Sequence, residues 1–180
     1  MTVQMKYTIL EIFSYFFVLF VWTIFRRYLK RNITGDILAG AIVGLFLEFS
    51  TKPVNIYHFH ITIYKDLPLI IPFDWGMMFA VTVYLSEKAY RFVLREPCIK
   101  PKDKRIFLFD VIIGTLVGFP LETAGAWLGA WEYNLGKIHW TLGNVPIFHM
   151  PWETVIAYAL IMLVGPTFVR YWQASFEGRP

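Results

Sequence analysis

Residues 110–122 read DVIIGTLVGFPLE, an apolar run that begins and ends with an acidic residue. Residues 36–48 read DILAGAIVGLFLE, with Asp, Gly, Val, Gly, Leu and Glu at the same places. In both runs Asp, Gly, Gly and Glu recur every four residues, which puts them along one face of a helix. The chain therefore repeats itself, and both copies are predicted to be helices.

The composition predicts a helical protein of the lipid bilayer. Hydrophobic residues make up 57% of the chain and charged residues only 17%, and the mean hydropathy is +0.50. Ordinary globular domains are less apolar and more highly charged. A membrane-spanning helix needs about 20 mainly apolar residues. We expect one all-α integral membrane domain over residues 1–180, with five spans at roughly 8–27, 35–51, 69–90, 106–129 and 147–170.

The distribution of basic residues predicts the orientation of these spans. Thirteen of the 17 Lys and Arg residues follow the first, third and fifth spans, and four lie on the other side. Because basic residues collect on the cytoplasmic side, the N-terminus is expected outside and the C-terminus in the cytoplasm. The first run carries Glu11 and has no small-residue cleavage site behind it, so we interpret it as a span. The expected location is the cell membrane, with multiple passes.

The repeat extends beyond the two quoted runs. Each copy continues into an aromatic loop and then a Pro-x-acid step, PFDW at 72–75 and PWET at 151–154, which makes Asp74 equivalent to Glu153. We predict a tandem parallel repeat of a two-helix unit, residues 36–86 and 110–165, behind an extra N-terminal helix. The glycine pairs Gly40/Gly44 and Gly114/Gly118 favour close helix packing, either within the chain or between copies in a homo-oligomer.

Six acidic residues of the repeat divide into three pairs. Asp36 and Asp110 are expected to cap the starts of their helices, where an acid suits the helix dipole. Asp74 and Glu153 fit helix capping and site use equally well. Glu48 and Glu122 lie toward helix C-termini, where the dipole disfavours an anion, which indicates a functional role. That role is the better explanation for Glu122, whereas placement at the membrane interface stays the alternative for Glu48, which ends a short span.

The topology brings four of these acids into the outer half of the membrane, where they can share one pocket between the repeats. Carboxylates crowded in a low dielectric cannot all ionise, so some are expected to be neutral proton donors and others proton acceptors. The predicted catalytic residues are Glu48, Asp74, Glu122 and Glu153.

Aromatic residues and histidines surround the same region. Most of the aromatic residues suit a membrane-interface belt, and the alternative is that their rings bind substrate and stabilise a cation. The candidates are Trp75, Trp127, Trp131, Tyr133, Trp140 and Trp152. Histidine ligands for a metal were also considered, but no H-x-x-H or H-x-x-x-H pattern is present, so loop hydrogen bonding is the better interpretation. The histidines concerned are His58, His60, His139 and His149.

Several function classes lack their sequence motifs. The chain has no phosphate-binding P-loop, no G-x-G-x-x-G turn and no G-x-S-x-G nucleophile elbow. Its one cysteine, Cys98, lies in a basic stretch and cannot form a disulfide within the chain. We expect no cofactor and no nucleic-acid partner.

The second repeat, PLETAGAWLGAWEYN (120–134) followed by LGNVPIFHMPWETVIAY (142–158), resembles the small membrane lycopene cyclases and related carotenoid end-group enzymes. The matching residues are Glu122, Trp131, Tyr133, Pro151 and Glu153, and in the first repeat Glu48, Pro72, Asp74 and Phe79. The resemblance covers about residues 36–160 and extends in general plan to the fungal membrane terpene cyclases. The chain departs from the family in having Glu at 122, single acids after each Pro, and only five spans.

This resemblance implies acid-catalysed cyclisation or hydration of an isoprenoid or carotenoid chain in the bilayer, without a cofactor. A buried carboxylic acid would protonate a C=C bond and aromatic rings would shield the carbocation. Two alternatives stay open: a proton-coupled carrier or binding protein for a lipophilic ligand that uses the same acids, and a metal-dependent lipid-modifying enzyme.

Overall fold

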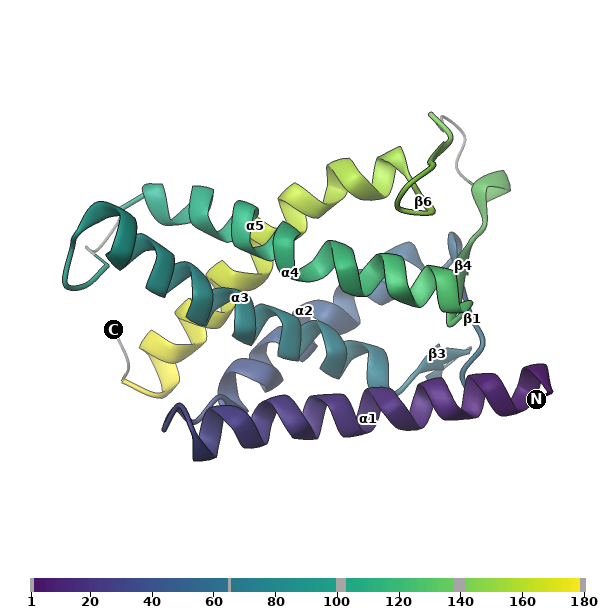
Figure 1. The fold of residues 1–180 in the computed structure, drawn as a ribbon, viewed down its shortest axis with the longest axis horizontal. Coiled ribbons are helices and arrows are strands. Elements are labelled where there is room, and N and C mark those ends of the chain that lie inside the picture. The colour runs from purple at the N-terminus through teal and green to yellow at the C-terminus, as the bar shows by residue number, and fades with distance from the viewer. Residues whose placement is uncertain (1, 65, 100–102, 138–141, 179–180) are drawn as a thin grey trace.

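A computed structural model describes residues 2–64, 66–99, 103–137 and 142–178. Within these ranges five helices run back and forth: α1 (Val3–Arg27), α2 (Thr34–Thr51), α3 (Ile70–Leu94), α4 (Arg105–Leu128) and α5 (Trp152–Phe176). Figure 1 shows them as an elongated bundle, with the N-terminus at one end and the C-terminus toward the other. The fold is therefore mainly helical, as predicted, and the helices begin and end within about six residues of the expected spans.

Short strands in the two long connections are a departure from the predicted all-α class. β1 (Asn55–Tyr57) pairs antiparallel with β4 (Trp131–Tyr133), and so joins the α2–α3 connection to the α4–α5 connection. Two further antiparallel pairs, each within one connection, are β2 (Thr62–Tyr64) with β3 (Leu67–Pro68) and β5 (Asn144–Val145) with β6 (Met150–Pro151). A short 3₁₀ turn, η1 (Leu135–Lys137), follows β4. We call this end of the bundle the strand end.

Four of the described helices, α1, α2, α4 and α5, are long and apolar enough to cross a membrane. Large apolar side chains stand exposed along them, including Phe16 on α1 and Leu116 on α4. Exposed apolar surface of this extent is unusual on a soluble monomer and is consistent with a membrane protein.

Among the described helices α3 is not one of those long and apolar enough to cross a membrane, although the sequence predicted a span there. It packs against all four other helices and carries more buried residues than any of them, including Thr82, Ser86 and Tyr90. A helix enclosed by its neighbours need not be apolar on every side, because its polar groups face protein instead of lipid. The predicted tandem repeat of α2–α3 and α4–α5 stays a prediction.

The glycines of the repeated runs allow close packing within the chain. A Cβ atom on Gly40 would lie 2.7 Å from the Gly76 Cα atom, so α2 and α3 touch backbone to backbone. Gly44 packs on Trp75, Gly114 on Met162 and Gly118 on Tyr158. All four glycines are therefore packed against helices of the same chain.

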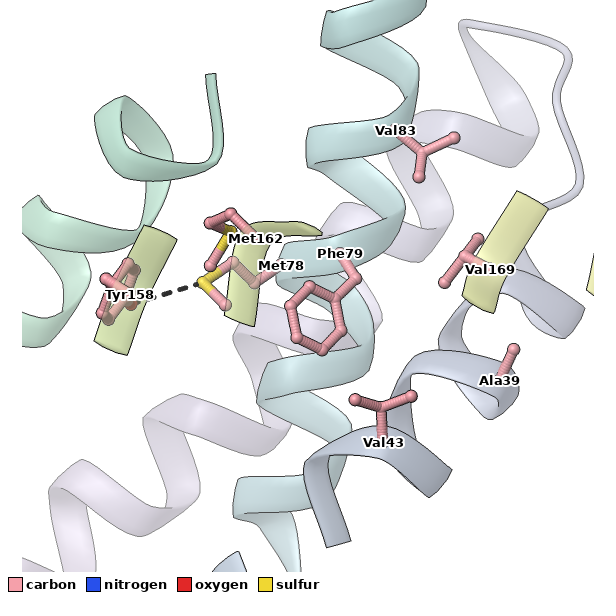
Figure 2. Packing of buried hydrophobic residues seen from close by; sticks show 8 residues of the cluster. All are labelled: Ala39, Val43, Met78, Phe79, Val83, Tyr158, Met162 and Val169. Atoms are coloured by element: carbon pink, nitrogen blue, oxygen red, sulfur yellow. Dashed lines mark hydrogen bonds between the residues drawn. The ribbon is translucent and has the colours of Figure 1, made fainter. Parts of the chain in front are cut away.

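An apolar cluster fills the middle of the bundle. Figure 2 shows its eight buried members on α2, α3 and α5, with the Tyr158 hydroxyl 3.7 Å from the Met78 sulfur. The members are Ala39, Val43, Met78, Phe79, Val83, Tyr158, Met162 and Val169. Along each of these helices the cluster lies between acidic residues near the strand end and charged or amide residues near the other end. It therefore separates two polar regions of the molecule.

Candidate functional site

A cavity of about 390 Å³ lies at the strand end and is lined by residues from all five helices and from β1 and β4. Its walls are mostly apolar, with Phe17, Met77, Leu121 and Ile161 among them. Its lining also includes all four predicted acids, Glu48, Asp74, Glu122 and Glu153. No Lys, Arg or His is found among the described residues that line it. The four acids therefore line one cavity, as expected from the sequence. Their chemical role stays a prediction.

Glu48, near the C-terminal end of α2, is 2% exposed and accepts two hydrogen bonds from neutral donors. The Tyr57 hydroxyl donates to its Oε2 over 2.5 Å, and the Trp75 indole N–H donates to its Oε1 over 2.7 Å. The aromatic donors satisfy the carboxylate without supplying a positive charge.

Glu122, on α4, is bound by the same two kinds of donor. The Trp131 indole N–H lies 3.0 Å from its Oε1, and the Tyr133 hydroxyl donates to the same oxygen. Both donors come from β4, whereas the Trp donor to Glu48 comes from α3. The two glutamates thus share a binding pattern that is assembled from different segments.

The pairing of β1 with β4 brings these donors together. Tyr57 lies opposite Trp131 and Asn55 opposite Tyr133, so the four side chains share the face that lines the cavity. Successive strand residues point to opposite faces, which leaves Glu132 exposed on the other side. Burial, reinforced by the adjacent carboxylates, raises the pKa of Tyr57 and of Tyr133 well above the ordinary value, so both phenols keep the proton they donate.

Asp74 and Glu153 occupy different positions, contrary to their predicted equivalence as helix-start residues. Glu153 lies in the first turn of α5 and accepts a hydrogen bond of 2.5 Å from the Leu142 N–H. Asp74 is the fifth residue of α3, because that helix begins at Ile70, before the Pro-x-acid step. Asp74 is one of the residues that line the cavity, and within the described ranges it forms no hydrogen bond or ion pair.

The predicted aromatic residues divide between the cavity and the outer surface. Trp75, Trp131 and Tyr133 line the cavity. Trp127 and Trp152 are 64% and 44% exposed, which suits the interfacial belt instead. Trp140 lies outside the described residues.

The histidines take part in loop contacts. His58 stacks on Tyr7 and lies 3.3 Å from a carboxylate oxygen of Glu132, and the ring of His149 meets Trp127 edge to face. The backbone N–H of His60 donates to Glu11. His139 lies outside the described residues. Within the part of the chain that is described, no three His, Cys, Asp or Glu residues are grouped as metal ligands would be.

Asp36 and Asp110 belong to a separate charged cluster at the end opposite the strands. The Arg170 guanidinium donates two hydrogen bonds to Asp110, of 2.6 and 2.7 Å, and Gln173 donates to Asp36 over 2.9 Å. Arg31 lies 3.7 Å from Asp36 and also pairs with Glu87. The capping role expected for Asp110 is wrong, because α4 begins five residues earlier. Asp36 does lie in the first turn of α2, yet its side chain is buried against α5.

Three residues with roles in or near the cavity were not predicted from the sequence. Tyr57 lies in the aromatic loop of the first repeat. It follows Glu48 in the sequence much as Tyr133 follows Glu122, and this correspondence could have identified it. Tyr158 is a buried helix residue with no distinguishing pattern. Glu11 accepts hydrogen bonds of 2.8 Å from the backbone N–H groups of His60 and Ile61, a loop contact that local sequence cannot reveal.

Comparisons of the chain with protein-family models, with curated proteins and with solved structures find no match.

Proposed function

We propose that the protein is a membrane enzyme that protonates a C=C bond of an isoprenoid chain, such as a carotenoid end group, and so forms a ring or adds water. The observation that supports this most directly is the cavity itself, in which four acids face apolar walls and aromatic rings with no basic residue in the described lining. Such a site would offer both proton donors and acceptors to an apolar substrate.

Asp74 is the best candidate for the proton donor. The oxygens of Glu48 and Glu122 are held by Tyr and Trp donors, and Glu153 holds the Leu142 N–H. In the described structure the carboxyl group of Asp74 makes no such hydrogen bond, so it is free to meet a substrate. Its protonated form would transfer the proton to one alkene carbon and leave a tertiary carbocation on the other.

The carbocation would then react in one of two ways. Attack by a second C=C bond would form a C–C bond, and loss of a proton to a cavity carboxylate would give a cyclic isomer. Capture of water would give an alcohol and return the proton to Asp74. The rings of Trp75, Trp131 and Tyr158 line the cavity, where their faces would stabilise positive charge.

The apolar cluster in the middle of the bundle favours an enzyme over the alternative of a carrier. A carrier must pass its ligand to the far side, yet Phe79, Val83 and Met162 are fully buried between the cavity and the charged cluster. The charged cluster is also occupied by its own ion pairs. An enzyme whose substrate enters and leaves through the bilayer needs no such passage.

Pigment analysis in a carotenoid-accumulating bacterial host tests the proposal. Wild type is expected to yield a product of unchanged mass for cyclisation, or one heavier by a water for hydration. Asp74→Asn is expected to lower product formation by about 10²-fold or more, the usual contribution of a general acid. Glu132→Gln, on the exposed face of β4, is the matched control and is expected to retain activity.

Two results would overturn the proposal. One is a well-folded wild-type protein that converts no isoprenoid offered, which would favour the carrier. The other is an Asp74→Asn variant with the activity of wild type, which would remove the assigned donor.

A further inference from the structure

Two mainly apolar helix stripes, one on α1 and one on α4, form part of the cavity lining. On α1 the stripe consists of Leu10, Phe13, Ser14 and Phe17, and on α4 of Leu121, Ala124, Gly125 and Leu128. Each set follows the spacing of one helix face. The cavity is therefore walled here by side chains from the middle of α1 and from the last turns of α4.

Several of these residues also reach the outer surface of the molecule. Phe13 is 61% exposed, and Leu121 and Leu128 are 39% and 47% exposed, although all three line the cavity. Side chains that line a cavity and also stand exposed mark its mouth. The mouth lies between α1 and α4, on helices that are long and apolar enough to cross a membrane.

The attachment of α1 explains why a gap is left there. Toward its N-terminus, Glu11 accepts two backbone hydrogen bonds from the β1–β2 connection, and near its C-terminus the Trp22 indole donates to Thr34 over 2.8 Å. Between these anchors α1 packs chiefly along α3 rather than α4. In Figure 1 it runs along the outside of the bundle for its whole length.

We propose that this mouth is a lateral opening to the bilayer, through which a long apolar chain enters end-on. At about 30 Å³ for a group the size of a water molecule or a methylene, the cavity holds roughly a dozen such groups. The terminal part of a longer isoprenoid then occupies the cavity, and the remainder lies between α1 and α4. The inference rests on the proposed function, because it names how the substrate of that site is bound.

Single cysteines at the mouth test the opening. Phe13→Cys and Leu121→Cys are made separately in a Cys98→Ser background, and the full chain is reconstituted in liposomes. The matched controls are Phe16→Cys and Leu116→Cys, exposed positions on the same helices that do not line the cavity. Reaction with a bilayer-soluble maleimide is followed with geranylgeraniol, with geraniol (an isoprenoid alcohol of half the length) or with neither.

Geranylgeraniol at about ten times its dissociation constant should slow labelling about tenfold at Phe13→Cys and Leu121→Cys. It should leave Phe16→Cys and Leu116→Cys unchanged. Geraniol fits inside the cavity and should protect the mouth far less. Equal slowing at all four positions, no slowing at the mouth, or equal protection by the two alcohols would each overturn the proposal.

The result is separable from the outcome of the pigment assay. Protection at the mouth without any product would leave the opening standing and count against the acid-catalysed reaction. Product without protection would support the reaction and remove the opening between α1 and α4.

Discussion

The two polar ends of the bundle hold their acids in contrasting ways. At the end opposite the strands, the buried Asp110 is paired with Arg170, and Asp36 with Arg31 and Gln173. At the strand end, Glu48 and Glu122 are held by Tyr and Trp donors that carry no charge. The first cluster pairs its acids with the guanidinium groups of Arg31 and Arg170, as a structural joint between helices does. The second leaves its negative charge uncompensated within the described lining, which is expected of a site that exchanges protons with a ligand.

This contrast separates acids that look alike in the sequence. Asp110 and Glu122 end the same apolar run, and both are positions where a membrane helix would avoid a charge. Their partners, not their positions along the helix, separate the structural role of Asp110 from the chemical role that we propose for the cavity that Glu122 lines. The following predictions test that distinction, beginning with the largest expected effect.

Removing Arg170 from the charged cluster at the end opposite the strands should destabilise the protein most. Arg170→Ala leaves the fully buried Asp110 without its partner, so we expect the free energy of unfolding to fall by about 3–5 kcal/mol. Unfolding in mixed micelles with increasing denaturing detergent measures it. Arg91→Ala, at an exposed position on α3, is the control and should change stability by at most about 0.5 kcal/mol. A loss at Arg170→Ala no larger than the control would contradict the structural role.

Converting an acid to its amide should have unequal effects at the two ends. Asp110→Asn removes the carboxylate to which Arg170 donates two hydrogen bonds and leaves only Glu87 among the described residues, 3.9 Å away, as its counter-ion. The expected cost is about 2 kcal/mol or more, the range for hydrogen bonds between charged groups. Glu122→Gln keeps an oxygen that accepts from Trp131 and Tyr133, and is expected to cost less than about 1 kcal/mol. The same unfolding measurement compares them. Equal losses in both variants would remove the contrast between the ends.

Crowding the boundary between the cavity and the apolar cluster should have a moderate effect. A Cβ atom on Gly118 would lie 2.5 Å from a ring carbon of Tyr158, so Gly118→Ala must move that ring. Overpacking of this kind typically costs about 1–3 kcal/mol. Gly136→Ala, on an exposed turn near the strand end, serves as the comparison and should be nearly neutral. Wild-type stability for Gly118→Ala would show that the ring is not fixed there.

The smallest effect concerns pH and a charge outside the helices. Hydrogen bonds from Arg105, and next from Tyr90, hold the pKa of Asp103 below its usual range. A lowered pKa in the folded state means that the contribution to stability is complete above about pH 4 and is lost as the pH falls further. The melting temperature of wild type should therefore drop more steeply below that pH than the melting temperature of Asp103→Asn. Parallel curves would show that the contact adds no stability.

Much of the fold could be predicted from hydrophobic runs and their spacing. The apolar runs predicted the helices, and the four-residue spacing of the glycines predicted close packing, which the contact between Gly40 and Gly76 confirms. The central position of α3 was not predictable in this way, because its polar residues have meaning only once four helices surround it. Its start at Ile70 agrees with the expected span from about residue 69, so the Pro-x-acid step at 72–74 lies inside the helix instead of opening it.

The candidate site shows the same division. Helix and loop order in the sequence placed Glu48, Asp74, Glu122 and Glu153 at one end, since antiparallel helices bring such residues together. The hydrogen-bond donors could not be assigned from the sequence, because Tyr57 reaches the cavity through the pairing of β1 with β4, more than 70 residues apart in the chain. The hydrogen bonds from the backbone N–H groups of residues 60 and 61 to Glu11 could not be predicted either, for the same reason. Residue types and spacing determine which helix faces are turned inward. The partner that satisfies each buried group instead depends on contacts between distant segments, and these exist only in the folded chain.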